Sequence, residues 1–556
     1  MITLDGHSLT IEQLAQIARD PSVHVGRDAV ANERVARAEA LIMRIVDKYR
    51  RSGERTYGVT TGFGEFKDKN IPPEDLEQLQ RNVLLSHSVG ICGDNAYFDA
   101  EVVRAALVTR LNAFLLGHSG VRRTMVDIVE AMINRGVVPL VPLKGSVGAS
   151  GDLCPLAHTF ATLLGVGEFF IVEDRQSCLS GQARLPVLHA SELPSVLGFD
   201  AEVMKPTFKE GLALVNGVNY SAAMLALGVF DGEHLAEMAD TAASMTLEAM
   251  CGCERALDHK VHEARGHPGQ IRSAARMREL IEGSHLIESA KAVQDPYSIR
   301  CAPQVHGASR DAIGFARATA EREINAATDN PLFFPDESDV AYSAGNFHGQ
   351  PIAIAADLLT IALAELASIS ERRIAMMLDG NHNRRLPQNL TTRPGVHSGL
   401  MIAQYTAASL VSENKVLSHP ASVDSIPTSA NAEDHVSMST HAARKMRTVL
   451  RNAEDVLAIE FLVVAQALDW RIGMAMDPLA PRREMSVAEA DEQARKFESV
   501  QPNKVAEGVA PNLRELYLRV RKVSPPVVRD RALSDDVSRV REELFSVRAG
   551  FSRPTG

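Results

Sequence analysis

The chain has 556 residues, of which 45% are hydrophobic and 23% charged, with 59 Lys and Arg against 70 Asp and Glu. This length and composition predict a globular protein with a large core, in several domains or in one with an attached part, and not a disordered chain. The net charge of −11 and the lack of a long basic run argue against a nucleic-acid partner.

The first twenty residues do not combine a basic start with an apolar stretch, so no signal peptide is predicted. No window holds the roughly 18 uninterrupted apolar residues that are typical of a membrane helix. Six cysteines are few for this length and are irregularly spaced, which favours reduced thiols. We therefore expect a cytoplasmic protein that does not bind a membrane.

Hydrophobic spacing predicts helices along most of the chain. Thr10-x-x-Gln13 resembles a capping box that opens a short helix. Apolar residues recur at helical spacing from about residue 100, and 351–377 and 453–470 are apolar on most faces, as in helices buried among other helices. The segment 168–173 is one of the few strand signals. The fold class predicted is mainly α, a large bundle of long helices with its loops gathered at one end.

We expect three regions in chain order: an N-terminal domain over 1–210, a central bundle of long helices over 211–480, and a more charged, peripheral helical region over 481–556. Loops that contain Gly and Pro interrupt the helices, and loops held on a rigid scaffold are where catalytic residues usually lie. These loops cover residues 57–64, 142–151, 294–304, 343–351 and 418–434.

Two cysteines and two histidines close together in the sequence are possible metal ligands. Cys251 and Cys253 precede His259 and His262, but the C-x2-C pair of zinc sites is missing. The simpler interpretation is a buried Cys-Gly-Cys segment followed by two histidines one turn apart on an exposed helix. We favour it, and no metal is expected.

The run GSVGASGDLCPLAH contains Ala149, Ser150 and Gly151, a tripeptide that by itself is typical of a flexible loop before a helix. The whole run resembles the signature of the histidine and phenylalanine ammonia-lyase family, in which Ala-Ser-Gly cyclises into a methylidene-imidazolone. The Gly151 nitrogen would attack the Ala149 carbonyl, unobstructed by a side chain, and Ser150 would lose its hydroxyl as water. Asp152 and Pro155 resemble the first turn of a helix whose positive end points at the ring.

The resemblance extends from about Tyr57 to about Arg471. It implies a fumarase/aspartase-like helical scaffold, no external cofactor, and a homotetramer in which several subunits build each site. The implied substrate is an aromatic L-amino acid, with L-histidine, converted to urocanate and ammonia, as the leading candidate. Besides the GASG loop, the motifs are YGVTTGFG, LLSHSVG, VNG, QDPYSIRCAPQ, EINAATDNP, AGNFHGQP, SENK and HPASVDSIPTSANAEDHVSM.

The resemblance also implies residue roles. Tyr57 is the base that takes the β-proton, for which it needs a lowered pKa or a nearby cation, because tyrosine ordinarily titrates near ~10. The glycines of its loop would let that loop fold tightly as a lid. Arg300 clamps the substrate carboxylate with two hydrogen bonds; the alternative is a helix-surface salt bridge. Supporting roles fall to Asn216 at the carboxylate or ring oxygen, Gln294 and Tyr297 in the proton relay, Phe347 at the substrate ring or cofactor, and Gln304 as an outer amide.

Two residues bear on the substrate. His87 lies in LLSHSVG, and Glu433 in SANAEDH resembles the glutamate that faces the imidazole in histidine ammonia-lyases. A carboxylate accepts a hydrogen bond from an imidazole N–H, whereas a phenyl ring offers none. For Glu433 alone, a helix-start cap is an equal alternative. Thr60, Ala432 and His306 depart from the histidine-enzyme pattern, in which Asn, Gln, and Met or Leu are expected at these positions.

Three alternatives remain open. A phenylalanine or tyrosine ammonia-lyase, or a 2,3-aminomutase, would use the same ring, and VTTGFG resembles those enzymes more closely. A fumarase-like lyase would share the bundle but carries a GSS-type loop, which this chain lacks. A helical scaffold with an inert site would be favoured if Tyr57, Ser150 or Arg300 were missing, and all three are present. Residues of about 480–510 look inserted relative to typical histidine enzymes.

Overall fold

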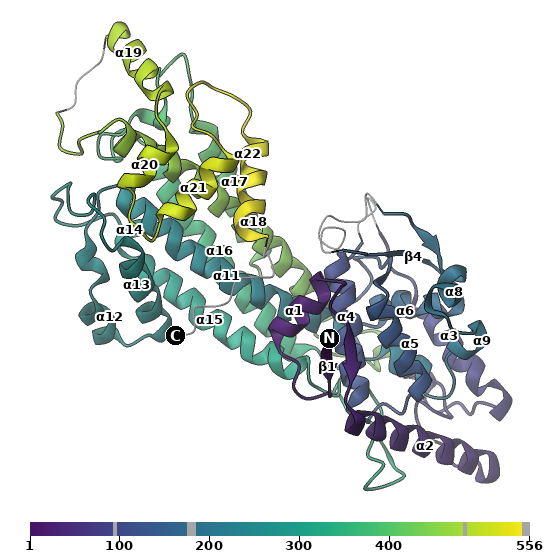
Figure 1. Cartoon of the computed structure of the whole chain (residues 1–556). Helices are drawn as coiled ribbons and strands as arrows, with labels where there is room; N and C mark the ends of the chain where they lie inside the picture. The colour runs from purple at the N-terminus through teal and green to yellow at the C-terminus, as the bar shows by residue number, and fades with distance from the viewer. Residues whose placement is uncertain (93–96, 175–184, 482–485, 547–556) are drawn as a thin grey trace. The chain divides into compact units, whose positions relative to one another are not determined.

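The computed structural model describes residues 1–92, 97–174, 185–481 and 486–546, and this part of the chain is mainly helical, as predicted (Figure 1). The chain divides into two compact units. Unit 1 comprises Met1–Phe230, Phe315–Asp357 and Pro420–Arg447; unit 2 comprises Asp231–Gly314, Leu358–His419 and Thr448–Gly556. Each unit therefore combines three separate stretches of the chain, and most of the boundaries between the units fall inside long helices. The expected division at residues 210 and 480 stays a prediction.

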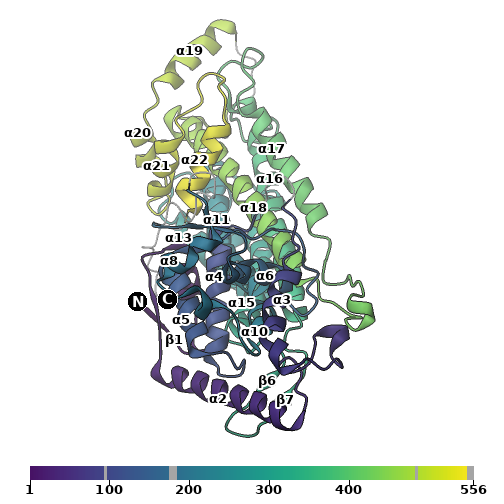
Figure 2. The same ribbon diagram turned by 90° about the vertical axis from the view of Figure 1, so that its right-hand side faces the viewer.

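Unit 1 is built around α4 (Ala100–Leu115), whose residues are all buried and which packs against α1 (Ile11–Arg19) and α5 (Arg123–Asn134). The capping box at the start of α1 is confirmed, since the Thr10 side chain accepts from the Gln13 N–H and the Gln13 side chain accepts from the Thr10 N–H. The helices α3 (Leu76–His87), α6 (Leu153–Ala161) and α10 (Glu210–Val215) pack on one another (Figure 2). The remaining short or peripheral helices are α2 (Ala29–Ser52), α8 (Leu193–Leu197) and α9 (Ala201–Met204).

The strands of unit 1 are short. β1 (Ile2–Leu4) pairs in parallel with β2 (Val25–Arg27), and β6 (Leu332–Phe333) pairs antiparallel with β7 (Ala341–Tyr342). The strand signal at 168–173 is confirmed as β4 (Glu168–Ile171), which lies between β3 (Val137–Pro139) and β5 (Leu188–His189) with Val138 opposite Phe170.

The larger parts of four long helices form the core of unit 2: α11 (Asn219–Ala249), α15 (Ala302–Glu323), α16 (Gln350–Leu378) and α18 (Ser439–Leu468), drawn side by side in Figures 1 and 2. Buried ion pairs join them. The Arg373 guanidinium on α16 lies 2.6 Å from the Glu460 carboxylate on α18, and both side chains are fully buried. A pair removed from water in this way needs good geometry, and Thr246 and Ser370 complete it by donating to the Glu460 carboxylate at 2.8 and 2.6 Å.

His306 on α15 belongs to the same polar core, which explains a histidine where Met or Leu was expected. Its Nδ1 lies 2.7 Å from a carboxylate oxygen of Asp240 on α11, whose second oxygen accepts from Arg310 at 2.6 Å. The His306 Nε2 lies 3.5 Å from the Arg373 guanidinium. The loss of hydration lowers the pKa of His306, although Asp240 opposes this effect. His306 is therefore a core residue of the bundle.

The segment 480–510, which looked inserted, contributes α19 (Val487–Glu498) and α20 (Pro502–Gly508) to unit 2. Phe497 of α19 stacks on the fully buried Trp470 with ring centroids 4.2 Å apart, so this segment covers the end of α18. The other helices of unit 2 are α12 (His259–Arg265), α13 (Pro268–Ile281), α14 (Tyr297–Arg300), α17 (Met401–Leu417), α21 (Arg514–Val523) and α22 (Ser534–Phe545).

The apolar helix α16 agrees with the prediction for 351–377. Among the described residues it is the helix long and apolar enough to cross a membrane by length and composition, but 67% of its most apolar window is buried inside the protein. The core helix of a bundle has the same composition, because apolar side chains face neighbours on most sides.

The Cys251–His262 segment differs in part from the expected exposed helix. His259 is exposed, but His262 is buried, with its Nε2 3.0 Å from the Ala256 carbonyl and its Nδ1 2.9 Å from the Gln270 amide. The Cys253 thiol donates to the Ala292 carbonyl. Within the described ranges, no group of three or more His, Cys, Asp and Glu side chains is arranged to hold a metal.

Candidate active site

The Ala-Ser-Gly tripeptide forms a tight turn immediately before α6. Ser150 and Gly151 have φ angles of +50° and +82°, and the Gly151 N–H donates to the Gly148 carbonyl at 3.3 Å. Only glycine adopts such φ angles without strain, so Ser150 is held in an unfavourable conformation. A Cβ on Gly151 would lie 2.2 Å from the Gly217 carbonyl oxygen, so glycine is also required for space.

The VNG turn holds this tripeptide from one side. The Gly217 N–H donates to the Ser150 carbonyl at 3.3 Å, and the Asp152 N–H donates to the Gly217 carbonyl at 2.7 Å. Asn216 precedes this pair, and its side-chain oxygen is buried without a hydrogen-bond partner. An unpartnered buried amide beside the turn fits a residue that binds a further group, as expected for Asn216.

Asp152 lies directly after the tripeptide, at the N-terminus of α6, and its side chain makes no capping hydrogen bond to the helix. Its fully buried carboxylate accepts from the backbone N–H and hydroxyl of Ser221, at 2.8 and 3.0 Å, and from the Thr440 hydroxyl at 2.6 Å. Burial raises the pKa of Asp152, and these hydrogen bonds partly oppose the rise. Thr440 also contacts the Ser146 hydroxyl at 2.8 Å. No local signal marks Ser146, Ser221 or Thr440 in the sequence.

Glu433 reaches the same tripeptide from a distant part of the chain. One carboxylate oxygen accepts from the Ser150 hydroxyl at 3.0 Å, and the other accepts from the Thr428 hydroxyl at 2.7 Å. Backbone hydrogen bonds in both directions join Thr428 and Glu433. Glu433 does not cap a helix start, since α18 begins at Ser439. The carboxylate is thus directed at the Ser150 hydroxyl.

Tyr57 belongs to the same group of side chains. Its loop lies beside the turn η8 (Ser429–Asn431), and its hydroxyl accepts a long hydrogen bond of 3.5 Å from the Gly64 N–H. The main effect on the Tyr57 pKa is a rise through burial, and the negative charges of Glu433 and Asp329 add to it. The surroundings of Tyr57 within unit 1 therefore do not lower its pKa, as was expected for a base, but favour the neutral phenol.

The Tyr57 loop is folded tightly, as its glycines suggested. Gly58 has a φ of +76°, and a Cβ there would lie 2.8 Å from Pro331. Thr60 is fully buried; its hydroxyl accepts from the Thr56 N–H at 2.8 Å and donates to the Thr56 carbonyl at 3.3 Å. Thr60, which stands where Asn was expected, therefore closes a backbone turn with its hydroxyl.

His87 lies near Glu433, and Phe347 precedes a residue that contacts the segment after Glu433. His87 ends α3, its Nδ1 is 3.0 Å from the Ser86 hydroxyl, and burial lowers its pKa while the charge of Glu433 raises it. Phe347 is half-buried, and the adjacent His348 contacts the His435 carbonyl through Nε2 at 3.1 Å. Unit 1 contains eight of the expected site residues: Tyr57, His87, Ala149, Ser150, Gly151, Asn216, Phe347 and Glu433.

The other expected residues, Gln294, Tyr297, Arg300 and Gln304, belong to unit 2. The Arg300 guanidinium lies over the Tyr297 ring at 4.7 Å from the centroid, and Tyr297 is 72% exposed. The Arg300 Nε and the Gln304 side-chain oxygen are buried without hydrogen-bond partners, and no described carboxylate pairs with Arg300. Arg300 is therefore not held in the helix-surface salt bridge that was its alternative.

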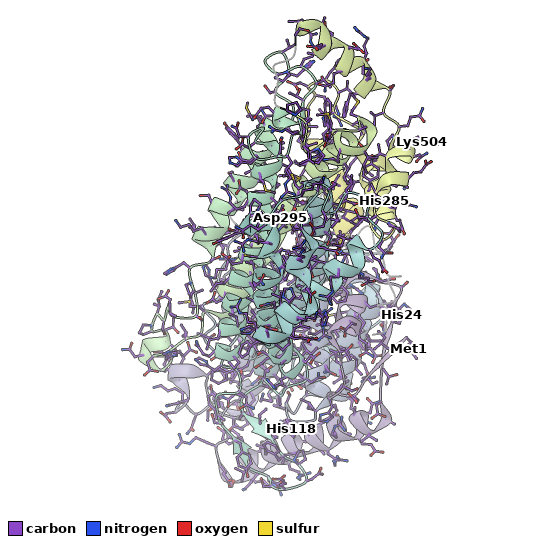
Figure 3. The ribbon with its side chains drawn as sticks, turned by 90° about the vertical axis from the view of Figure 1, so that its left-hand side faces the viewer. Met1, His24, His118, His285, Asp295 and Lys504 are labelled. Carbon is purple, nitrogen blue, oxygen red and sulfur yellow. The ribbon has the colours of Figure 1, made fainter. Side chains whose placement is uncertain are left out.

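Two arginines hold the turn that carries Arg300: Arg384, which is half-buried, and Arg373, which is fully buried. The Asp295 carboxylate, labelled in Figure 3, accepts from Arg384 at 2.5 Å and from the Cys253 N–H at 2.7 Å. Arg373 donates to the Ser298 carbonyl at 3.4 Å. These contacts hold the backbone at Asp295, before α14, and at Ser298, within it. They therefore fix the position of the backbone that carries the Arg300 side chain.

Comparison with known proteins gives the family of the chain. The family model for aromatic amino acid lyases matches residues 9–492. A histidine ammonia-lyase of Caldanaerobacter subterraneus subsp. tengcongensis is 49% identical over 474 residues, which cover 85% of this chain and 89% of that protein. The structure of histidine ammonia-lyase from Trypanosoma cruzi matches with a TM-score of 0.80 and 36% identity, covering 98% of this chain and 93% of the other.

A tyrosine aminomutase from Streptomyces globisporus also matches, with a TM-score of 0.82 and 32% identity over 98% of this chain and 97% of the other. The likeness covers nearly the whole chain in both structures, so the helical scaffold is shared. The chain belongs to the aromatic amino acid lyase family.

Proposed function

We propose that this lyase eliminates ammonia from L-histidine to form urocanate, with a methylidene-imidazolone formed from Ala149, Ser150 and Gly151. The observation that carries the proposal is the Glu433 carboxylate held 3.0 Å from the Ser150 hydroxyl, beside Tyr57 and His87. Once the Ser150 hydroxyl is lost, an imidazole N–H bound there would donate to the Glu433 oxygen that faced it, whereas a phenyl ring would leave that oxygen without a donor. The names of the relatives support the same substrate.

The residues around the tripeptide fit the ring. Gly151 has no space for a side chain, and Asn216 presents an unpartnered buried oxygen next to the turn. Formed there, the ring supplies an electrophile that makes the amine a workable leaving group. The N-terminus of α6 follows at once and favours negative charge at the ring.

The chain's own side chains do the remaining work. Tyr57 accepts the β-proton of the substrate. To do so its phenol must first be deprotonated, although burial and nearby negative charge raise its pKa. Arg300 binds the substrate carboxylate through the guanidinium that Tyr297 supports. Gln294 and Tyr297 assist proton transfer, Phe347 packs against the substrate ring or cofactor, and Gln304 orders the Arg300 surroundings.

The active enzyme is proposed to be a cytoplasmic homotetramer with sites built from several subunits, and without an external cofactor, a metal, a membrane or a nucleic acid. Of the seventeen residues of α17, only Ala407 and Asn414 are buried. Its exposed apolar residues include Ile402, Tyr405 and Val416. A helix this apolar normally packs against another surface, and a second copy of the chain would supply one.

The second candidate is a phenylalanine or tyrosine ammonia-lyase, or a 2,3-aminomutase. The likeness to the tyrosine aminomutase structure supports it, since the scaffold accommodates that chemistry as well. It would leave Glu433 without an imidazole partner, which is why we place it second.

Incubation of the purified protein with L-His, L-Phe and L-Tyr separates these candidates. The histidine proposal requires urocanate and ammonia in equal amounts from L-His. Release of a β-amino acid would indicate an aminomutase, and conversion of only L-Phe or L-Tyr would refute the histidine assignment. Ser150→Ala, which cannot form the methylidene group, is the matched control for contaminating activity.

A further inference from the structure

Among the described residues, the Ser150 hydroxyl has one carboxylate partner. The Ser150 Oγ donates to Glu433 at 3.0 Å. The nearer acid in sequence, Asp152, has both oxygens occupied by Ser221 and Thr440. Among the described residues, Glu433 is therefore the acid that contacts the group leaving during ring formation.

The local backbone keeps Glu433 in this position. The Thr428 hydroxyl donates to the second carboxylate oxygen at 2.7 Å. Ser429, Ala430 and Asn431 between them all have left-handed φ angles, of 50°, 52° and 66°. Non-glycine residues adopt such angles only where the surrounding structure requires it, and these strained turns concentrate at functional sites.

We propose that Glu433 is a catalytic residue of ring formation as well as a substrate-binding residue, and that it protonates the Ser150 hydroxyl as that hydroxyl leaves. This inference rests on the proposed self-formed electrophile. It gives Glu433 a task that is complete before any substrate binds. The carboxylate that releases the serine oxygen then remains beside the new methylidene carbon, where the substrate must approach.

The step balances without another reactant. The first water combines the Ala149 carbonyl oxygen with the hydrogens of the Gly151 and Ser150 nitrogens, and it leaves on ring closure. In the second dehydration the Cβ–Oγ bond of Ser150 breaks, and Glu433 in its acid form gives a proton to the departing oxygen. The Cα–H electron pair of Ser150 becomes the Cα=Cβ bond, and that proton returns to the carboxylate through the released water.

Intact mass spectrometry of purified variants tests the proposal independently of activity. Wild type is expected to be two water molecules lighter than its translated sequence. Glu433→Gln keeps the shape and a hydrogen bond but has no proton to give, so it should accumulate protein lighter by one water. The second dehydration should slow by about 10²–10⁴-fold, the usual contribution of a general acid. Asp434→Asn, which removes the exposed neighbouring carboxylate, is the matched control and should lose both waters.

The outcomes separate this inference from the function on which it rests. Wild-type protein that retains both waters would refute the self-formed ring itself. Folded Glu433→Gln that loses both waters as fast as wild type, or that loses neither, would refute the role of Glu433 and leave the enzyme assignment intact. Should Glu433→Gln not fold, Thr428→Val frees one carboxylate oxygen, and it should yield a mixture of one-water and two-water losses. Complete modification of Thr428→Val at the wild-type rate would then overturn the inference.

Discussion

Replacing Arg300 with Lys should weaken substrate binding much more than turnover. The guanidinium lies 4.7 Å from the Tyr297 ring centroid, and its Nε is buried and unpartnered, so it is arranged to receive a carboxylate. Lysine keeps the charge but offers a point donor in place of a fork. The loss of one charge-assisted hydrogen bond, about 1.5–3 kcal/mol, corresponds to a KM that is about 10- to 100-fold higher.

Steady-state kinetics with L-histidine measure this effect, with Arg272→Lys, an exposed substitution in the same unit, as control. Inhibition by histamine, which has the imidazole and amine but no carboxylate, should be the same in wild type and Arg300→Lys. An unchanged KM for histidine would show that Arg300 is structural. An equal loss of histidine and histamine binding would mean that the substitution disturbs the whole site and not the carboxylate clamp.

Three further predictions follow from the described contacts. Tyr57→Phe should fold normally and lose about 10²–10⁴-fold in kcat, and near-normal turnover of this variant would show that Tyr57 is not the base. The kcat/KM of the wild type should rise with pH, because burial and nearby negative charge raise the pKa of Tyr57 and only the deprotonated phenol accepts the proton. Gly151→Ala should keep the mass of its translated sequence, since its Cβ would lie 2.2 Å from the Gly217 oxygen, and a loss of two waters would contradict the close approach. Arg19 and Arg447 lower the pKa of the buried Glu101 to about 2, so its contribution, roughly 3 kcal/mol, should be present above pH 4.5 and lost as the pH falls toward 2. Acid unfolding of Glu101→Gln should lack that part of the pH dependence.

Local features of the sequence were enough to predict the fold class, whereas the electrophile is expected from the resemblance of longer motifs. The capping box at Thr10 and the apolar segment that became α16 depend on residues a few positions apart, so their spacing carries the information. The same holds for Gly151, because ring closure and the left-handed turn both exclude a side chain at that position. The resemblance of long motifs then supplied the family.

Tertiary structure alone decided which side chains meet. Ser150 and Glu433 are 283 positions apart, and Thr440 lies 288 positions from Asp152, so no periodicity or spacing relates them. The same is true of His306, whose buried ring has polar partners on α11 and α16. A side chain's partners, and with them its pKa, depend on how helices pack, because desolvation and Coulomb interactions act through space and not along the chain.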